Sequence, residues 1–179
     1  MSSPVRFREA VAEDIPVLQA LSRAIWYACY PNVISTEQIE YMLPRMYGDD
    51  VLRREMHREG YHYELVLVEG EPAGYLSWRH DPASASVELS KVYLQPVHHG
   101  KGLGQRMLAH VAERARQAGA RSIHLRVNKG NAPAIAAYRR GGYTVRDSLV
   151  AGIGGGFVMD DFVMEKTLDN GREHAAPKA

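Results

Sequence analysis

Three glycines at alternate positions, Gly100, Gly102 and Gly104, form the part of the sequence that most directly indicates a chemical role. They follow a segment that alternates like a strand and precede one with the apolar spacing of a helix. Alternating glycines let backbone N–H groups turn inward, and a helix N-terminus adds unpaired donors and the positive end of its dipole. This glycine turn (100–104) predicts a cradle for a phosphate or pyrophosphate; a tight connection that binds nothing is the alternative.

Two better-known phosphate cradles do not match the glycine turn. The Walker pattern GxxxxGK[ST] is absent, which argues against a P-loop nucleotide hydrolase. The glycines are spaced GxGxG instead of GxGxxG, and antiparallel strands are expected before them instead of a βαβ unit. A Rossmann dinucleotide site is therefore not expected.

A second segment, Asn131 to Tyr143, predicts a helix whose N-cap is Asn131. Ala134 and Tyr138 stand at positions i and i+4, so the tyrosine lies on a helix face that carries small residues. Small side chains there would let a thin ligand pack against the helix while the phenol reaches beyond it. Taken alone, the pattern also fits an ordinary amphipathic helix with a core tyrosine.

The rest of the chain predicts the elements that must position these two segments. Capping and apolar spacing predict two helices that begin near Asp14 and Ser35, the second kinked or shortened by Pro44. The other expected elements are a strand at 5–8, a helix at 50–60, strands at 61–68, 74–79 and 87–94, a helix at 102–118, a strand at 123–127, a helix at 132–140, and strands at 143–145 and 157–166. This order predicts a mixed α+β sheet in a single domain, residues 1–168, followed by a disordered tail at 169–179.

Together the two segments resemble the GNAT superfamily of acetyl-CoA-dependent N-acetyltransferases. The first signature of that family is commonly written [Q/R]-x-x-G-x-[G/A], and His99, Gly102 and Gly104 stand at its defined positions. His99 replaces the usual Gln or Arg, which affects the contact of that side chain and leaves the backbone cradle unchanged. The resemblance runs from about residue 65 to residue 168. It implies the GNAT fold, a mostly antiparallel mixed sheet with helices on both faces and two splayed central strands.

The resemblance also implies roles for individual residues. In GNAT proteins the glycine turn holds the pyrophosphate of coenzyme A, and the backbone of the preceding strand hydrogen-bonds the pantetheine arm. The residues that this implies in acetyl-CoA binding are Val92, Leu94, His99, Gly100, Lys101, Gly102, Leu103, Gly104, Asn131 and Tyr138. Tyr138 matches the usual general acid that protonates the departing thiolate, and packing against the pantetheine sulfur is its alternative role.

A base or a water chain must deprotonate the attacking amine, because most aliphatic amines are protonated at pH 7. Glu88 lies four residues before Val92, where some GNAT enzymes carry a catalytic glutamate, and alternation predicts that both side chains share one face. An exposed glutamate without a role is the alternative, and His98, His99 and His124 are weaker candidates for the base. No metal is expected, because the eight histidines show no ligand spacing such as HExxH.

Acceptor specificity falls to the least constrained parts of the chain, the first two helices and residues 150–161. That segment carries three consecutive glycines and the acidic pair Asp160 and Asp161. Carboxylates near the site would favour a cationic acceptor, and the motif order resembles the polyamine-acetylating branch of bacterial GNAT enzymes; a solvated acidic turn is the alternative. Tyr30 is one of several aromatic residues in the N-terminal helices that could line an acceptor pocket, or equally form core or dimer contacts.

Composition narrows the class of protein further. The 179 residues carry 22 Lys+Arg and 21 Asp+Glu, and a net charge of +1 argues against nucleic acid or an anionic membrane as a partner. A single cysteine, Cys29, excludes an internal disulfide and fits the cytoplasm. No apolar run approaches the roughly 18 residues of a membrane span, and the first residues lack the apolar core of a signal peptide.

The sequence therefore favours an enzyme that moves the acetyl group of acetyl-CoA directly to a primary amine of a small, cationic acceptor. Cys29 lies away from both segments, which disfavours a covalent cysteine intermediate. A peptide or protein N-acetyltransferase and a non-catalytic acyl-CoA-binding regulator are the alternatives. A homodimer is expected only by analogy with the family.

Overall fold

The structure, a computed structural model, describes residues 4–169 of the chain. The disordered tail predicted at 169–179 lies outside the described residues except for Asp169. The elements in chain order are β1 (Val5–Glu9), the short 3-10 helix η1 (Ala12–Asp14), α1 (Ile15–Cys29), α2 (Thr36–Tyr47), α3 (Asp49–His57), β2 (His62–Val68), β3 (Glu71–Asp81), β4 (Ser86–Leu94), the 3-10 helix η2 (Pro96–His98), α4 (Leu103–Gln117), β5 (Ser122–Asn128), α5 (Ala132–Arg140), β6 (Thr144–Gly154) and β7 (Phe157–Thr167).

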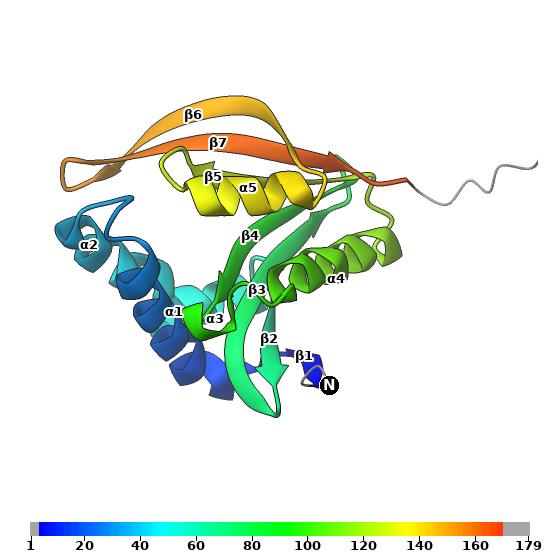
Figure 1. Ribbon diagram of the computed structural model, residues 1–179, viewed down its shortest axis with the longest axis horizontal. Helices are drawn as coiled ribbons and strands as arrows, with labels where there is room; N and C mark the ends of the chain where they lie inside the picture. Colours follow the sequence, from blue (N-terminus) through cyan, green and yellow to red (C-terminus); the bar gives the residue numbers. More distant parts are fainter. Residues whose placement is uncertain (1–3, 170–179) are drawn as a thin grey trace, which may run out of the picture.

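Seven strands form one sheet in the order β1-β2-β3-β4-β5-β7-β6. Within the described residues, β4 and β5 run parallel and every other neighbouring pair is antiparallel. The sheet is therefore mixed and mostly antiparallel, which confirms the α+β fold class. The chain enters β5 from α4 and leaves it through α5 (Figure 1), so the two segments with a predicted chemical role flank the parallel pair.

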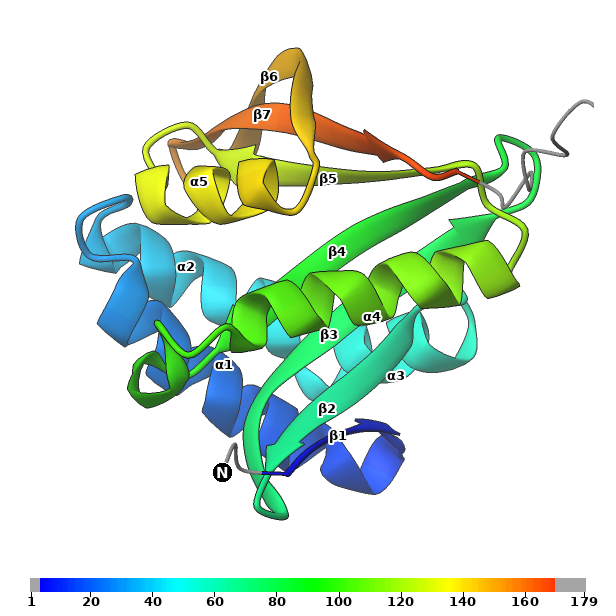
Figure 2. The ribbon, with the colours of Figure 1, turned by 45° about the vertical axis from the view of Figure 1, so that its right-hand side comes forward.

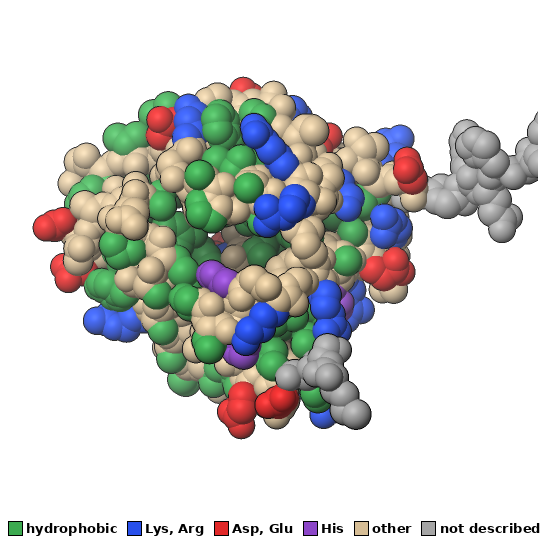
Figure 3. Space-filling view, in the orientation of Figure 1, with side chains coloured by type: hydrophobic (Ala, Val, Ile, Leu, Met, Phe, Trp, Pro, Cys, Tyr) green, Lys and Arg blue, Asp and Glu red, His purple; other side chains and the backbone are tan. Residues whose placement is uncertain are grey.

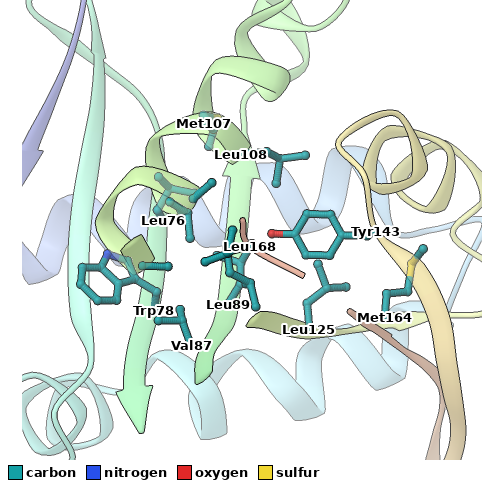
Figure 4. Packing of buried hydrophobic residues seen from close by; sticks show 14 of the residues in the cluster. Leu76, Trp78, Val87, Leu89, Met107, Leu108, Leu125, Tyr143, Met164 and Leu168 are labelled. Carbon is teal, nitrogen blue, oxygen red and sulfur yellow. The ribbon is translucent and has the colours of Figure 1, made fainter. Parts of the chain in front are cut away.

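Helices cover both faces of the sheet, as the family resemblance implied. Helices α4 and α5 lie on one face, and α1, α2 and α3 lie on the other (Figure 2). Each face has its own apolar core. The core under α4 and α5 includes Leu76, Met107 and Leu125 (Figure 4), and the core under α1 to α3 includes Leu18 and Leu65. Burial of each such side chain stabilises the fold by roughly 1.5–3 kcal/mol.

Local signals in the sequence set the starts of two helices. The Ser35 Oγ accepts a hydrogen bond from the Gln38 N–H at 3.1 Å, so the predicted cap begins α2. The Asn131 side chain accepts a hydrogen bond from the Ala134 N–H at 3.3 Å and begins α5. Pro44 does not end α2, which continues past it.

The β6–β7 hairpin is longer than predicted, because β6 runs to Gly154 instead of ending near residue 145. Gly154, Gly155 and Gly156 have φ angles of +88°, +63° and +80°, which favour glycine. A Cβ on Gly155 would lie 2.7 Å from the ring of Tyr41 in α2. The Tyr41 hydroxyl also donates a hydrogen bond to the Ile153 carbonyl at 3.0 Å. The three glycines therefore let the tip of the hairpin pack directly on α2.

A buried carboxylate, Glu64 of β2, connects the sheet to α4. Glu64 is 3% exposed and accepts hydrogen bonds from Arg114 Nε at 3.1 Å and from Trp78 Nε1 at 3.4 Å. It also pairs with His110 Nε2. Burial opposes the ionisation of Glu64, but His110 and Arg114 outweigh it and hold the pKa of Glu64 below its usual value. The network fixes α4, which begins within the glycine turn, with Gly102 as its N-cap and Gly104 in its first turn.

Replacing Glu64 by Gln is expected to lower the free energy of unfolding by about 2 kcal/mol at pH 7, because two basic partners lose their carboxylate. The lowered pKa of Glu64 adds stability above the pKa of the unfolded chain, roughly 4.3, and that stability is lost as the pH falls. The difference between wild type and variant should therefore shrink toward about pH 3. Urea unfolding at both pH values measures it, and equal stability at pH 7 would refute a stabilising role.

Candidate active site

The parallel pair β4 and β5 opens into a wedge. The two strands are paired only at their first residues, ending with Glu88 opposite His124. Beyond this pair they separate, and α5 lies beside the widening gap (Figure 1). Two adjacent strands that part in this way leave backbone groups without a neighbour in the middle of a sheet. The splay is the feature that the family resemblance implied.

Backbone N–H and C=O groups of β4 point into the wedge. The Gln95 N–H donates a hydrogen bond to the Ala73 carbonyl of β3 at 2.9 Å. Because these groups alternate along an antiparallel strand, the N–H and C=O of Leu94 and Val92 point away from β3. The wedge therefore presents the free edge of a strand, which an extended, amide-bearing molecule can join as an added strand.

His99 closes the loop that follows β4. Its ring Nε2 lies 2.7 Å from the Leu94 carbonyl oxygen, so this nitrogen carries the hydrogen and donates it. The residue that replaces the usual Gln or Arg of the family signature therefore folds back onto the end of β4. This contact occupies the Leu94 carbonyl and leaves the Leu94 N–H directed into the wedge.

The glycine turn has the open geometry of an anion cradle. Gly100 and Gly102 have φ angles of +72° and +75°, and Gly102 is the N-cap of α4. A Cβ on Gly100, Gly102 or Gly104 would meet no atom within 4 Å, so the turn faces open space. Leu103 is buried and anchors the helix start, whereas Lys101 is exposed. The free N–H groups of the first turn of α4 point to this space. A hollow lies on the same face, between α5 and the start of α4 (Figure 3).

Tyr138 of α5 lies beside the wedge on the face that α4 covers. It packs against the same apolar core as Val92 and Leu94. The Gln105 side chain donates a hydrogen bond to the Ala137 carbonyl at 3.0 Å, which holds α5 against the start of α4. Burial, and then the neighbouring phenol of Tyr30, raise the pKa of Tyr138 far above its usual value. The Tyr138 hydroxyl therefore keeps its proton at neutral pH.

A β-bulge in β4 changes which side chains share a face. The register with β3 passes from Trp78↔Leu89 to Ser77↔Lys91, so Ser90 is the extra residue. Val87, Leu89, Val92 and Leu94 all pack under α4 and α5, whereas Tyr93 packs under α1 to α3. The prediction that Glu88 and Val92 lie on one face is wrong, because it assumed regular alternation.

Glu88 lies at the point of the wedge, on the face of α1 to α3. Its Oε2 accepts hydrogen bonds from the Tyr61 hydroxyl and from Arg79, each at 3.0 Å. The carboxylate is therefore already neutralised by a cation and is partly exposed, with 33% of the side chain accessible. It can orient groups near the wedge, but one of its oxygens is already occupied.

Tyr30, the C-cap residue of α1, reaches the wedge from the face opposite Tyr138. Its pKa lies well above the usual value because of burial, a hydrogen bond with Tyr93 and the nearby charge of Asp161. Asp161 of β7 is 3% exposed on this face. Asp160 is exposed and pairs with Lys129 instead. Of the two carboxylates that were predicted to bind the acceptor, only Asp161 therefore lies near Tyr30.

Sequence reasoning did not single out a buried lysine in β4. The Lys91 side chain is 3% exposed, and its Nζ lies 3.0 Å from Glu55 Oε2 of α3. Its charge also faces the rings of Tyr47, Tyr61 and Tyr63 at 5.2–5.9 Å. A second charged residue inside β4, besides Glu88, was the available signal, but the partner on α3 depends on tertiary structure.

Residues 4–169, which the structure describes, lack two other kinds of feature. No group of three or more His, Cys, Asp or Glu side chains there is placed to hold a metal ion. No helix of this part is long and apolar enough to cross a membrane.

Known proteins resemble the chain in both sequence and fold. Streptothricin acetyltransferase of Streptomyces lavendulae is 36% identical over 81 residues, which cover 45% of this chain and 43% of that enzyme, so the chain spans less than half of this relative. Spermidine N(1)-acetyltransferase of Thermoplasma acidophilum is 23% identical over 170 residues, 93% of this chain and 99% of that enzyme.

Among solved structures, the PaiA N-acetyltransferase from Thermoplasma acidophilum in complex with coenzyme A has a TM-score of 0.77 at 22% identity. The match covers 92% of this chain and 99% of the other, which shows that the fold is shared. The model of the acetyltransferase (GNAT) family matches residues 23–143, more than half of the chain and including the wedge, the glycine turn and Tyr138. The protein therefore belongs to the GNAT family, acetyltransferases that take their acetyl group from acetyl-CoA.

Proposed function

We propose that this GNAT enzyme transfers the acetyl group of acetyl-CoA directly to a primary amine of a small, cationic acceptor, in a ternary complex. The observation that carries the proposal is the wedge between β4 and β5. It has an open anion cradle at one end, and protonated Tyr138 and buried Asp161 lie on its two faces. Residues 1–168 act as one domain, which works in the cytoplasm, where a single cysteine stays reduced.

The acetyl-CoA side of the site is formed mainly by backbone groups. The glycine turn, from His99 and Gly100 to Gly104, binds the pyrophosphate through free N–H groups, and Lys101 adds a positive charge at its rim. The outward-facing N–H and C=O groups of Val92 bind the amides of the pantetheine arm, as does the Leu94 N–H. The Asn131 oxygen caps α5, so its NH₂ group is the part that contacts the coenzyme.

Acetyl transfer then requires stabilisation of two developing negative charges. The Val92 N–H points into the wedge and donates to the carbonyl oxygen of the thioester as the amine nitrogen attacks the carbonyl carbon. Tyr138 gives its proton to the sulfur as the carbon–sulfur bond breaks, which its raised pKa permits because the phenol is still protonated at pH 7.

Contacts between α2 and the β6–β7 hairpin support a small acceptor over a peptide. The Gln38 side chain donates to the Val158 carbonyl at 3.2 Å, and the Tyr41 hydroxyl donates to the Ile153 carbonyl at 3.0 Å. These bonds join the two elements on the face where Tyr30 lies, so the acceptor side is walled instead of open along its length. A relative named for spermidine and another named for streptothricin are consistent with small acceptors.

The test is acetyl-CoA-dependent release of free thiol across a panel of monoamines, diamines, spermidine and short peptides. Release with spermidine or a diamine is expected. Release with peptides alone would replace the small acceptor by a protein N-terminus or lysine. Binding of acetyl-CoA without release across the whole panel would favour a regulator that binds acyl-CoA and does not catalyse transfer.

A further inference from the structure

Asp161 lies at the level where the wedge must hold the reacting thioester. The last paired residues are Glu88 of β4 and His124 of β5. Val92 stands three levels further along β4, because Ser90 is an extra residue, and it is therefore about level with Val127 of β5 on the opposite side of the wedge. The next residue of β5, Asn128, is paired with Asp161 in β7. This carboxylate therefore lies one strand away from the gap and within about one residue of the height of the Val92 N–H.

The Asp161 carboxylate is buried, and one of its oxygens has no hydrogen-bond partner among the described residues. The residue is 3% exposed, and the unpaired oxygen is Oδ1. Leaving a buried neutral polar group unpaired lowers the free energy of unfolding by about 1–3 kcal/mol, and an unpaired oxygen of a buried carboxylate lowers it by more. Such a group destabilises the free protein, and binding of a cationic donor would relieve the cost.

None of the charged or titratable groups described around Asp161 occupies the position next to its unpaired Oδ1. Arg126 and Lys129 favour its ionised form, and Asp160 opposes it. Neither base forms a salt bridge with Asp161, since Lys129 pairs with Asp160. Tyr30 is the group that Asp161 influences from the face of α1 to α3. Asp161 is therefore buried beside an aromatic residue. Arg126 and Lys129 are near enough to favour its negative charge, but neither contacts its carboxylate directly.

We propose that Asp161 receives the ammonium group of the acceptor and takes one proton from it, an inference that rests on the proposed function. The step forms an O–H bond on the carboxylate and breaks one N–H bond, which leaves a neutral amine with a lone pair. That lone pair forms the new C–N bond to the thioester carbonyl, and the thiolate leaves with the Tyr138 proton. The amide nitrogen loses a second proton, which restores the Tyr138 hydroxyl, and Asp161 releases its proton to solvent.

Burial makes this proton transfer favourable in a way that exposure would not. A buried ammonium and a buried carboxylate are both destabilised, and moving one proton between them removes both charges. Burial already raises the pKa of the Asp161 carboxyl, before the smaller effects of its neighbours. Glu88 is less suited to accept this proton, because Arg79 and Tyr61 both donate to the same carboxylate oxygen and stabilise its negative charge.

The experiment compares wild type with Asp161→Asn and with the matched control Asp147→Asn, an exposed aspartate of β6. Steady-state rates with spermidine, or with the best amine of the panel, are measured from about pH 7 to pH 10. At pH 7 the D161N variant is expected to lose roughly tenfold or more in kcat/KM for the amine, with acetyl-CoA affinity unchanged. The loss should shrink toward pH 10, where the amine is increasingly neutral in solution.

Thermal unfolding separates this role from a structural one. Because burial raises the pKa of Asp161, ionisation destabilises the fold as the pH rises through that pKa. The D161N variant should therefore unfold at the same temperature as wild type or higher at pH 8, with a smaller gain near pH 4. A reduced melting temperature would indicate a structural role and overturn the proposal.

The remaining outcomes also decide the question. Wild-type rates in D161N would overturn the proposal and leave acetyl transfer itself intact. A tenfold loss that stays constant from pH 7 to pH 10 would show that Asp161 does not accept the proton. Inactivity of the wild type on every amine, despite acetyl-CoA binding, would overturn the proposed function, and this inference with it. A comparable loss in D147N would show that the effect is not specific to Asp161.

Discussion

Replacing Tyr138 by Phe is expected to lower kcat roughly 100-fold and to leave the dissociation constant of acetyl-CoA nearly unchanged. A positioned proton donor typically contributes 100-fold or more to the rate. Tyr138 can donate because burial and the nearby Tyr30 keep its pKa far above 7. The groups proposed to bind acetyl-CoA are mainly backbone amides, which the substitution does not touch. Stopped-flow thiol release and equilibrium binding of acetyl-CoA measure the two quantities separately.

A neighbouring tyrosine offers the matched control. The ring of Tyr143 lies 5.8 Å from that of Tyr138, and its hydroxyl is buried without a hydrogen-bond partner among the described residues (Figure 4). Tyr143→Phe removes the same atom from the same core and should change neither kcat nor acetyl-CoA affinity. Wild-type turnover in Tyr138→Phe would exclude the acid role. Loss of acetyl-CoA binding instead would assign Tyr138 to packing against the coenzyme.

Elements with strong local signals were predictable from the sequence. The predicted helix at 132–140 coincides with α5, whose Asn131 cap and apolar spacing are local features. The same holds for α4 and for strands β2 to β5, which differ from prediction by a few residues at their ends. β6 was predicted too short, because most of its side chains are exposed and two glycines, Gly152 and Gly154, interrupt its last residues.

The faces of β4 could not be predicted, because the bulge at Ser90 leaves no mark in the local pattern. Alternation across 88–92 looks regular in the sequence, and one extra residue inverts which side chains share a face. The glycine turn, in contrast, is a backbone feature encoded within five residues. Its open geometry therefore followed from the sequence.

The proposed acceptor side depends on contacts between distant segments. Tyr30 and Asp161 are 131 positions apart in the sequence numbering, and only the packing of α1 against the wedge brings them together. The sequence could indicate their residue types, aromatic and acidic, but not that Asp161 is buried while Asp160 is exposed and paired with Lys129. Side-chain alternation within β7 decides that difference.

Replacing Gly102 by Ala is expected to weaken acetyl-CoA binding roughly 100-fold. The Gly102 φ angle of +75° suits glycine, and a Cβ there would enter the open space of the cradle. The new methyl group and the strained backbone would displace the N–H groups from the pyrophosphate. Loss of one or two charge-assisted hydrogen bonds, each about 1.5–3 kcal/mol, accounts for the expected change in affinity.

Gly119, at the other end of α4, separates the two causes of that loss. Its φ angle is +81°, and a Cβ there would also meet no atom within 4 Å. Gly119→Ala therefore carries the same backbone strain, about 1 kcal/mol, at a site remote from the cradle. Both variants should unfold at a similarly reduced temperature, whereas calorimetric titration with acetyl-CoA should detect weaker binding only in Gly102→Ala. Equal affinities in the two variants would mean that the turn does not hold the pyrophosphate, since strain at either end of α4 would then have the same consequence.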